Sequence, residues 1–128
     1  MKKTTMFVML LLSLGLMTVG GCSSSSSDPT TPATFSILGT WAYTMLSGNN
    51  TWDTGTFTFT GTSESGTYTQ LNIYNVTYTG TYTVSGVNVT LDGPENYSGT
   101  FSDADNISGT WVSDSDANLN GTWTAVRQ

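Results

Sequence analysis

Hydrophobic and polar side chains alternate with a period of two through residues 35–128, which is typical of strands with one apolar face. The clearest alternating runs are residues 37–45, 74–84, 107–111 and 119–125. Clusters of Gly, Asn, Asp and Ser separate the runs and mark turns. The pattern predicts an all-β domain of about eight strands. Short turns between successive strands favour an antiparallel up-and-down barrel, because closure removes exposed strand edges.

A Gly-Thr-aromatic unit recurs through this domain. It begins at Gly39, Gly55, Gly66, Gly80, Gly99, Gly109 and Gly121. Each glycine lies two residues before an aromatic residue, so both are expected on the inward face. A glycine there leaves room for a ring from the neighbouring strand and lets the sheet bend sharply. Alternatively, these glycines serve only bulges or turns, and both interpretations suit a tightly curved sheet.

The first residues of the chain are typical of an export signal. Lys2 and Lys3 precede an apolar run at residues 7–19, which is shorter than the roughly 20 residues that span a bilayer. The run ends in Val-Gly-Gly-Cys at residues 19–22, which resembles the lipobox of bacterial lipoproteins. That resemblance implies a signal peptide of residues 1–21, cleavage before Cys22, and acylation of the Cys22 thiol and amino group. A plain secretory signal with an incidental cysteine is the alternative.

A tether follows the cysteine. Residues 22–34 are rich in Ser, Thr and Pro and contain no large apolar side chain, so they cannot bury enough surface to order themselves. Two or more acyl chains on Cys22 would make a stable anchor. The lipoprotein resemblance therefore implies a membrane-bound protein with the barrel of residues 35–128 on a flexible linker. Ser23 after the cysteine favours the outer membrane of a diderm bacterium, on its periplasmic or surface face.

Charge and composition narrow the chemistry. The chain has nine acidic and three basic residues, no histidine and one cysteine. Histidine acid/base catalysis, an internal disulfide and a Cys/His zinc site are thereby excluded, and nucleic-acid binding is not expected with so few basic residues. The acidic residues of the barrel domain fall at predicted turns or strand ends, where solvation should keep their pKa values ordinary. We therefore expect no enzyme activity, no cofactor and no metal site.

The domain resembles the lipocalin-like, or calycin, group, and in particular the compact lipocalin-like domains of bacterial lipoproteins. Gly39 and Trp41 form the Gly-x-Trp that opens an eight-stranded meander, and Arg127 lies in the last predicted strand. The resemblance implies that Trp41 lies near the closed end of the barrel. It also implies that the Arg127 guanidinium packs across the Trp41 ring as a cation–π contact.

The expected interior is strongly aromatic. Its tyrosines are Tyr43, Tyr68, Tyr74, Tyr78, Tyr82 and Tyr97, and only Trp52 breaks the inward phase. So many rings could fill a small barrel completely. However, buried tyrosine hydroxyls need partners, and Gln70 is the one polar side chain expected inside, so the hydroxyls could instead reach the mouth or line an amphipathic pocket. Trp52 either caps the mouth or is an outward surface ring.

Two functions follow from these alternatives. The first is a non-catalytic, membrane-anchored module that binds a small hydrophobic or amphipathic ligand. Its candidate ligand-binding residues are Tyr43, Tyr68, Tyr78, Tyr82, Tyr97 and Trp52. The second is a structural or interaction lipoprotein of the cell envelope with a fully packed barrel and no ligand. A void of about 300 Å³ or more would favour the first function.

Overall fold

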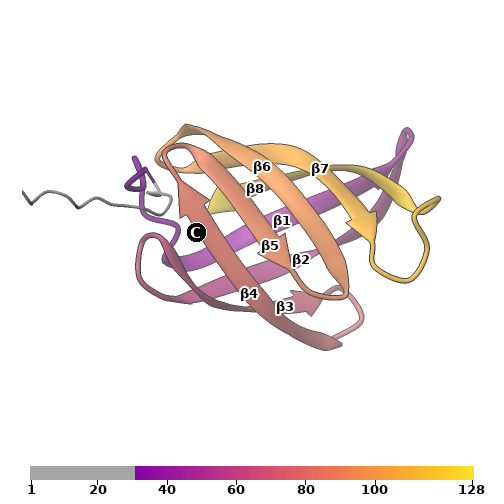
Figure 1. Cartoon of the computed structure of the whole chain (residues 1–128). Helices are drawn as coiled ribbons and strands as arrows, with labels where there is room; N and C mark the ends of the chain where they lie inside the picture. Colours follow the sequence, from indigo (N-terminus) through magenta and orange to yellow (C-terminus); the bar gives the residue numbers. More distant parts are fainter. Residues whose placement is uncertain (1–30) are drawn as a thin grey trace, which may run out of the picture. The chain divides into compact units, whose positions relative to one another are not determined.

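Residues 31–128 are described by a computed structural model, in which eight antiparallel strands close into a barrel in sequence order (Figure 1). The strands are β1 (Gly39–Ser47), β2 (Asn50–Gly61), β3 (Ser65–Asn72), β4 (Thr77–Ser85), β5 (Asn88–Asp92), β6 (Glu95–Asp103), β7 (Asn106–Ser113) and β8 (Asn120–Arg127). This part of the chain contains no helix, and hence none that could cross a membrane. The prediction of an all-β up-and-down barrel is confirmed. The predicted signal peptide, Cys22 and residues 23–30 lie outside the described residues.

The compact unit begins at Thr31, upstream of the predicted domain start at Phe35. The backbone N–H of Thr34 donates to the Gly86 carbonyl at 2.8 Å, and the Gly86 N–H donates to the Thr31 carbonyl at 3.2 Å. Ala33 packs against the core. The last residues of the predicted linker therefore pair with the β4–β5 turn.

The antiparallel order gives the barrel two different ends. At one end, which we call the closed end, the segment before β1 lies against the barrel, and Ile37 and Trp41 are fully buried. The Trp41 indole N–H donates to the Ile37 carbonyl at 2.8 Å, and the Phe101 ring lies 5.9 Å from the Trp41 ring. The other end, which we call the mouth, carries the β1–β2, β3–β4, β5–β6 and β7–β8 connections.

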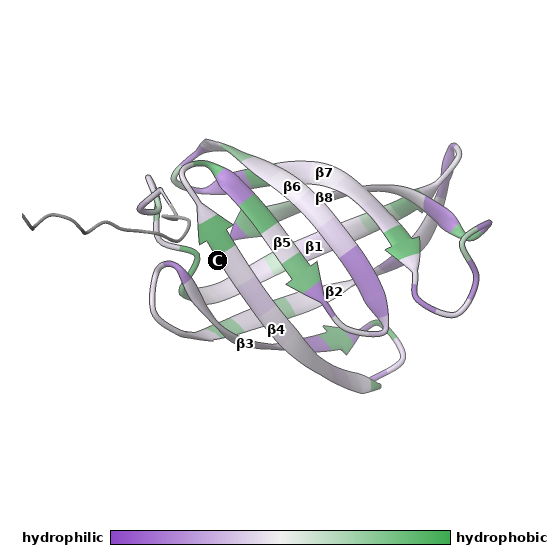
Figure 2. Ribbon diagram, viewed as in Figure 1, coloured by the Kyte–Doolittle hydropathy of each residue, from purple (hydrophilic) through white to green (hydrophobic). Residues whose placement is uncertain are grey.

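The core follows the period-two pattern, and Figure 2 shows hydrophobic and hydrophilic positions alternating along β5. One parity of nearly every strand is buried, and the opposite parity is mostly exposed Thr, Ser and Asn. The Phe57 ring lies near the centre of the aromatic contacts. It meets Tyr68, Tyr97 and Trp123 edge to face at centroid distances of 5.4–6.0 Å. The middle of the barrel is therefore filled by rings.

The inward prediction is wrong for Tyr74, which is 78% exposed, and for Val76, which is 42% exposed. Both residues lie in the β3–β4 turn rather than in a strand. The Asn72 side chain causes this local change, because its Oδ1 accepts the backbone N–H groups of Tyr74 and Val76 at 2.9 Å. Asn75 then reverses the chain with a φ of 63°.

Cross-strand register explains several of the repeated glycines. Gly80 lies opposite Tyr68 and Gly121 lies opposite Trp111. A Cβ atom on Gly80 would lie 2.6 Å from the Tyr68 ring, and one on Gly99 would lie 2.7 Å from the Trp123 ring. At these positions, the predicted packing of rings over glycine backbone is present. Other glycines do serve turns, such as Gly86 with a φ of 62°.

Candidate functional site

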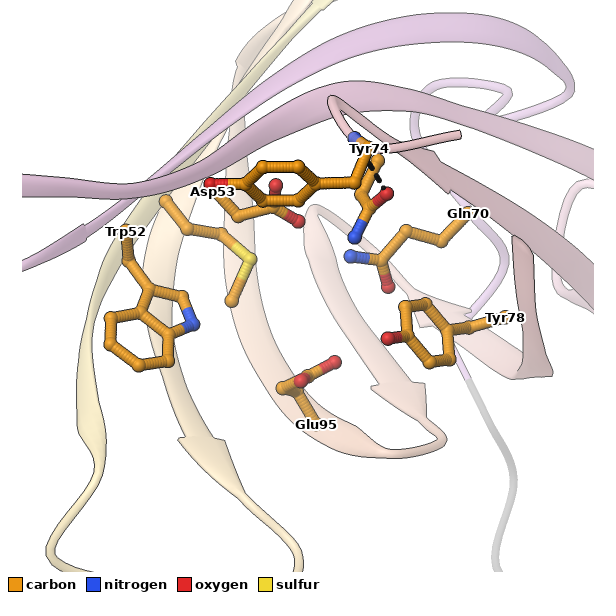
Figure 3. Close-up of a pocket in the computed structure, with 8 residues that line it drawn as sticks. Trp52, Asp53, Gln70, Tyr74, Tyr78 and Glu95 are labelled. Atoms are coloured by element: carbon orange, nitrogen blue, oxygen red, sulfur yellow. Dashed lines mark hydrogen bonds between the residues drawn. The ribbon is translucent and has the colours of Figure 1, made fainter. Parts of the chain in front are cut away.

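A pocket of about 390 Å³ opens at the mouth of the barrel. Its lining side chains come from strands β1, β2, β3, β4 and β6 and from the β3–β4 turn. They are Met45, Trp52, Asp53, Gln70, Asn72, Tyr74, Tyr78 and Glu95. Figure 3 shows the rings of Trp52 and Tyr78 on opposite sides of the pocket, with Glu95 between them. The barrel is thus packed in its middle and hollow at one end.

Aromatic rings form the walls of this pocket. Trp52 is 48% exposed, and its ring stacks on Trp111 with an interplanar angle of 28° and a centroid distance of 6.0 Å. The Trp111 indole N–H donates to the Leu46 carbonyl at 3.0 Å, which fixes the ring beneath Trp52. Tyr78 is half-buried, and Tyr74 forms the exposed rim. Trp52 therefore lies at the mouth of the barrel, where it lines the pocket while half of its surface stays exposed.

A polar network lies at the base of the pocket. Gln70 is only 1% exposed, and its amide nitrogen donates to the Tyr43 hydroxyl at 3.0 Å. The Tyr97 hydroxyl donates to Gln70 Oε1 at 3.2 Å, and the Tyr43 hydroxyl donates to Asp53 Oδ2 at 2.7 Å. Burial raises the pKa values of Tyr43 and Tyr97, so both hydroxyls keep their protons. The hydrogen bond from Tyr43 therefore fixes the orientation of the Asp53 carboxylate.

Asp53 and Glu95 are the two residues of the pocket lining that carry carboxyl groups. Asp53 Oδ1 and Glu95 Oε2 are buried and have no hydrogen-bond partner among residues 31–128. Burial raises the pKa of Glu95, and the charge of Asp53 raises it further. The expectation that solvation leaves every carboxyl ordinary is therefore wrong for Glu95. Each of these carboxyl groups therefore has a buried oxygen without a partner, and a hydrogen-bond donor would offset the cost of burying it.

The structure separates the sequence-predicted site residues into three groups. Trp52 and Tyr78 line the pocket, while Tyr43 and Tyr97 contact the lining residue Gln70 from the core. Two other candidates are buried away from the pocket lining: Tyr68 on β3 and Tyr82 on β4. The Tyr82 hydroxyl donates to the Thr62 carbonyl near the closed end.

The three residues that carry the lipocalin-like resemblance, Gly39, Trp41 and Arg127, lie at the closed end. The Arg127 guanidinium carbon is 4.4 Å from the centre of the Trp41 ring, as the resemblance implies. The guanidinium also donates to the Leu38 carbonyl at 2.9 Å and forms an ion pair with Asp105 at 3.0 Å. Gly39 has a φ of 110°, a backbone conformation that favours glycine. These residues close the barrel far from the mouth.

Sequence reasoning missed Asp53 and Glu95 as site residues. A signal was present, because Asp53 shares the inward parity of Phe57 and Phe59 on β2. Glu95 likewise shares the inward parity of Tyr97 on β6. Because both residues lie close to a predicted turn, they were interpreted as solvated rather than as part of the inward face.

The fold and pocket define a class: a closed eight-stranded barrel with one open end, compatible with a lipocalin-like fold. No protein-family model matches the sequence, and no curated protein is significantly similar to it. Within residues 31–128, no three His, Cys, Asp or Glu residues are grouped so that they could hold a metal ion.

Replacing Gln70 with Leu is expected to lower the free energy of unfolding by about 1–2 kcal/mol. The Tyr97 hydroxyl would lose its oxygen acceptor, and the Tyr43 hydroxyl would lose a donor. Urea denaturation measures the change. Adding Tyr97→Phe to Gln70→Leu should recover part of the loss, since both partners are then apolar. An unchanged midpoint for Gln70→Leu would contradict the network.

Replacing Glu95 with Gln is expected to raise stability at neutral pH. The folded state holds the Glu95 proton more tightly than the unfolded state, so ionisation of Glu95 opposes folding as the pH rises. The variant and the unaltered chain should have the same thermal midpoint at pH 3, where this carboxyl is protonated in both the folded and unfolded states. At pH 7, the variant should have the higher midpoint. Thermal midpoints at the two pH values measure the difference.

Asp103 provides a control because its pKa is shifted in the opposite direction from that of Glu95. Hydrogen bonds from the Asp105 and Asn106 N–H groups lower the pKa of Asp103, so its charge favours folding above the acid range. Asp103→Asn should therefore lower the midpoint at pH 7 and leave it unchanged well below the ordinary pKa of the carboxyl. The same pH response for Glu95→Gln and Asp103→Asn would contradict the site electrostatics.

Proposed function

We propose that the protein is a lipid-anchored binding module whose barrel mouth holds a small amphipathic ligand. The pocket of about 390 Å³ carries this proposal, because ligand sites commonly occupy about 300–1,000 Å³ and combine apolar walls with a few polar groups. Here, Trp52 and Tyr78 supply the rings, and Gln70, Asp53 and Glu95 supply the polar groups. The non-catalytic role is part of the same proposal.

Binding can be tested by tryptophan fluorescence, because Trp52 lines the pocket. The full chain carrying Cys22→Ser should show a saturable change with at least one of three probes: dodecanoate, phenol or phenethyl alcohol. Tyr78→Ala should weaken the binding, whereas Tyr82→Phe should not, since Tyr82 lies outside the pocket lining. The absence of a saturable change with all three probes would count against a binding module of this kind.

The anchor is tested separately. The Val-Gly-Gly-Cys sequence supports acylation of Cys22, and the Ser-rich residues after it support a tether. In a diderm bacterium, the unaltered chain should fractionate with the outer membrane, and Cys22→Ser should release it. Membrane attachment that persists in Cys22→Ser would refute the lipid anchor while leaving the pocket proposal intact.

The filled middle of the barrel supports the second candidate, a structural envelope lipoprotein. Phe57, Tyr97 and Trp123 contact one another there with centroid distances of 5.3–6.0 Å. A ligand that needs a deep central cavity, such as a long folded acyl chain, is therefore not favoured. The mouth pocket distinguishes this barrel from a fully packed one, and the fluorescence titration decides between the two functions.

A further inference from the structure

The mouth pocket combines negative charge with aromatic walls. Asp53 and Glu95 are its two acidic lining residues, and the pKa of Glu95 is raised by burial and, to a smaller extent, by the charge of Asp53. The sequence after Cys22 has a single basic residue, Arg127, which lies at the closed end on Asp105 and the Leu38 carbonyl. No side chain of residues 31–128 thus supplies a cation to this pocket.

The two acidic residues of the lining indicate which ligand chemistry the pocket favours. Asp53 Oδ1 and Glu95 Oε2 are buried acceptors, and a buried acceptor without a donor is costly. An N–H donor with positive charge satisfies both the hydrogen bond and the electrostatics. A quaternary ammonium group has no N–H donor, and a carboxylate ligand would add repulsion.

The walls favour an organic cation over a metal ion. Trp52 and Tyr78 face the pocket from opposite sides, and aromatic faces attract cations and stack on flat apolar groups (Figure 3). Divalent metal ions prefer a shell of several oxygen ligands, and no cluster of three His, Cys, Asp or Glu residues occurs in residues 31–128.

From these observations we infer that the pocket binds a small protonated primary amine carried on an aromatic or other flat apolar body. The ammonium group donates to the carboxylates of Asp53 and Glu95, and the apolar body lies between Trp52 and Tyr78. This inference rests on the proposed binding function and names its ligand class. Gln70 and Tyr43 position the Asp53 carboxylate for this contact.

Three probes that share one ring test the charge requirement. Isothermal titration of the full Cys22→Ser chain at pH 7.5 would compare phenethylamine, phenethyl alcohol and 3-phenylpropionate, which are cationic, neutral and anionic. Phenethylamine should bind at least about tenfold more tightly than the alcohol, because a hydrogen bond to a charged group contributes more than a neutral one. The carboxylate should bind most weakly.

Two pocket variants and one matched control test the residues. Asp53→Asn and Glu95→Gln should each weaken phenethylamine binding by about tenfold. Both variants should leave phenethyl alcohol binding nearly unchanged, which a collapsed pocket would not do. Asp103→Asn removes a carboxylate charge from the exposed end of β6, at the closed end of the barrel, and should leave both affinities unchanged.

Several results would overturn the inference. Equal or tighter binding of the alcohol or the carboxylate would reject an amine ligand and still support a binding module. If Ca²⁺ alone bound more tightly than phenethylamine, and if Asp53→Asn and Glu95→Gln abolished Ca²⁺ binding, the pocket would be reassigned to a metal ion. No binding of any of the three probes would also reject the inference, and dodecanoate and phenol would then test the binding function independently.

Discussion

Replacing Trp41 with Ala is expected to lower the free energy of unfolding of the barrel by about 3–5 kcal/mol. Trp41 is fully buried, donates to the Ile37 carbonyl, contacts the Phe101 ring and receives the Arg127 guanidinium on its face. The substitution removes these three contacts and leaves a cavity at the closed end. Since small domains are stable by about 5–15 kcal/mol, much of the total would be lost.

Urea denaturation of the full Cys22→Ser chain measures this loss. Trp52→Ala is the matched control, because it removes the same ring from a half-exposed position at the mouth. The control should cost at most about 1 kcal/mol, the contribution of one aromatic pair. Comparable losses for Trp41→Ala and Trp52→Ala would contradict the assignment of Trp41 to the structural core of the closed end.

Replacing Gly80 with Val is expected to cost about 3 kcal/mol, at the upper end of the usual range for overpacking. Even a Cβ atom at this position would lie 2.6 and 2.8 Å from two atoms of the Tyr68 ring. The ring cannot move aside easily, since it also meets Phe57 edge to face at 5.5 Å. The Asp92 carbonyl limits the space on the backbone side.

Thr81→Val is the control for this substitution. Thr81 follows Gly80 on β4, is exposed, and accepts a β-branched apolar residue of similar size. Its replacement should change the free energy of unfolding by no more than about 0.5 kcal/mol. A tolerated Gly80→Val would show that Tyr68 does not pack over the glycine backbone as the register indicates.

The sequence predicted the barrel well because its strands differ strongly in polarity between their two faces. On β4, for example, Thr81 and Thr83 face outward while Tyr82 and Val84 are buried. That contrast fixes both the strand type and the register, since a one-residue slip would exchange the faces. Polar turns between the strands then gave the strand number.

The same pattern failed where a turn continued the alternation by chance. Tyr74 and Val76 keep the parity of the β4 tyrosines, yet Asn72 accepts both of their backbone N–H groups and holds them in a turn. A side-chain hydrogen bond of this kind competes with strand pairing. Residue parity alone does not distinguish the two outcomes.

The site was predicted only in part. Trp52 and Tyr78 were identified by their rings, but Asp53 and Glu95 were assigned to solvated turns or strand ends because they lie next to predicted turns. In the barrel, both lie on the inward face beside the pocket. Ionisation of Glu95 opposes folding, and residues that sacrifice stability in this way often serve function.

Indole N–H resonances in an ¹⁵N NMR spectrum test the mouth site most directly. The chain has four tryptophans, of which Trp52 lines the pocket, Trp111 stacks beneath it, and Trp41 lies at the closed end. Titration of the Cys22→Ser chain with phenethylamine should shift the Trp52 and Trp111 resonances saturably and leave Trp41 unchanged. An unchanged Trp52 resonance, or an equal shift of Trp41, would contradict a ligand site at the mouth of the barrel.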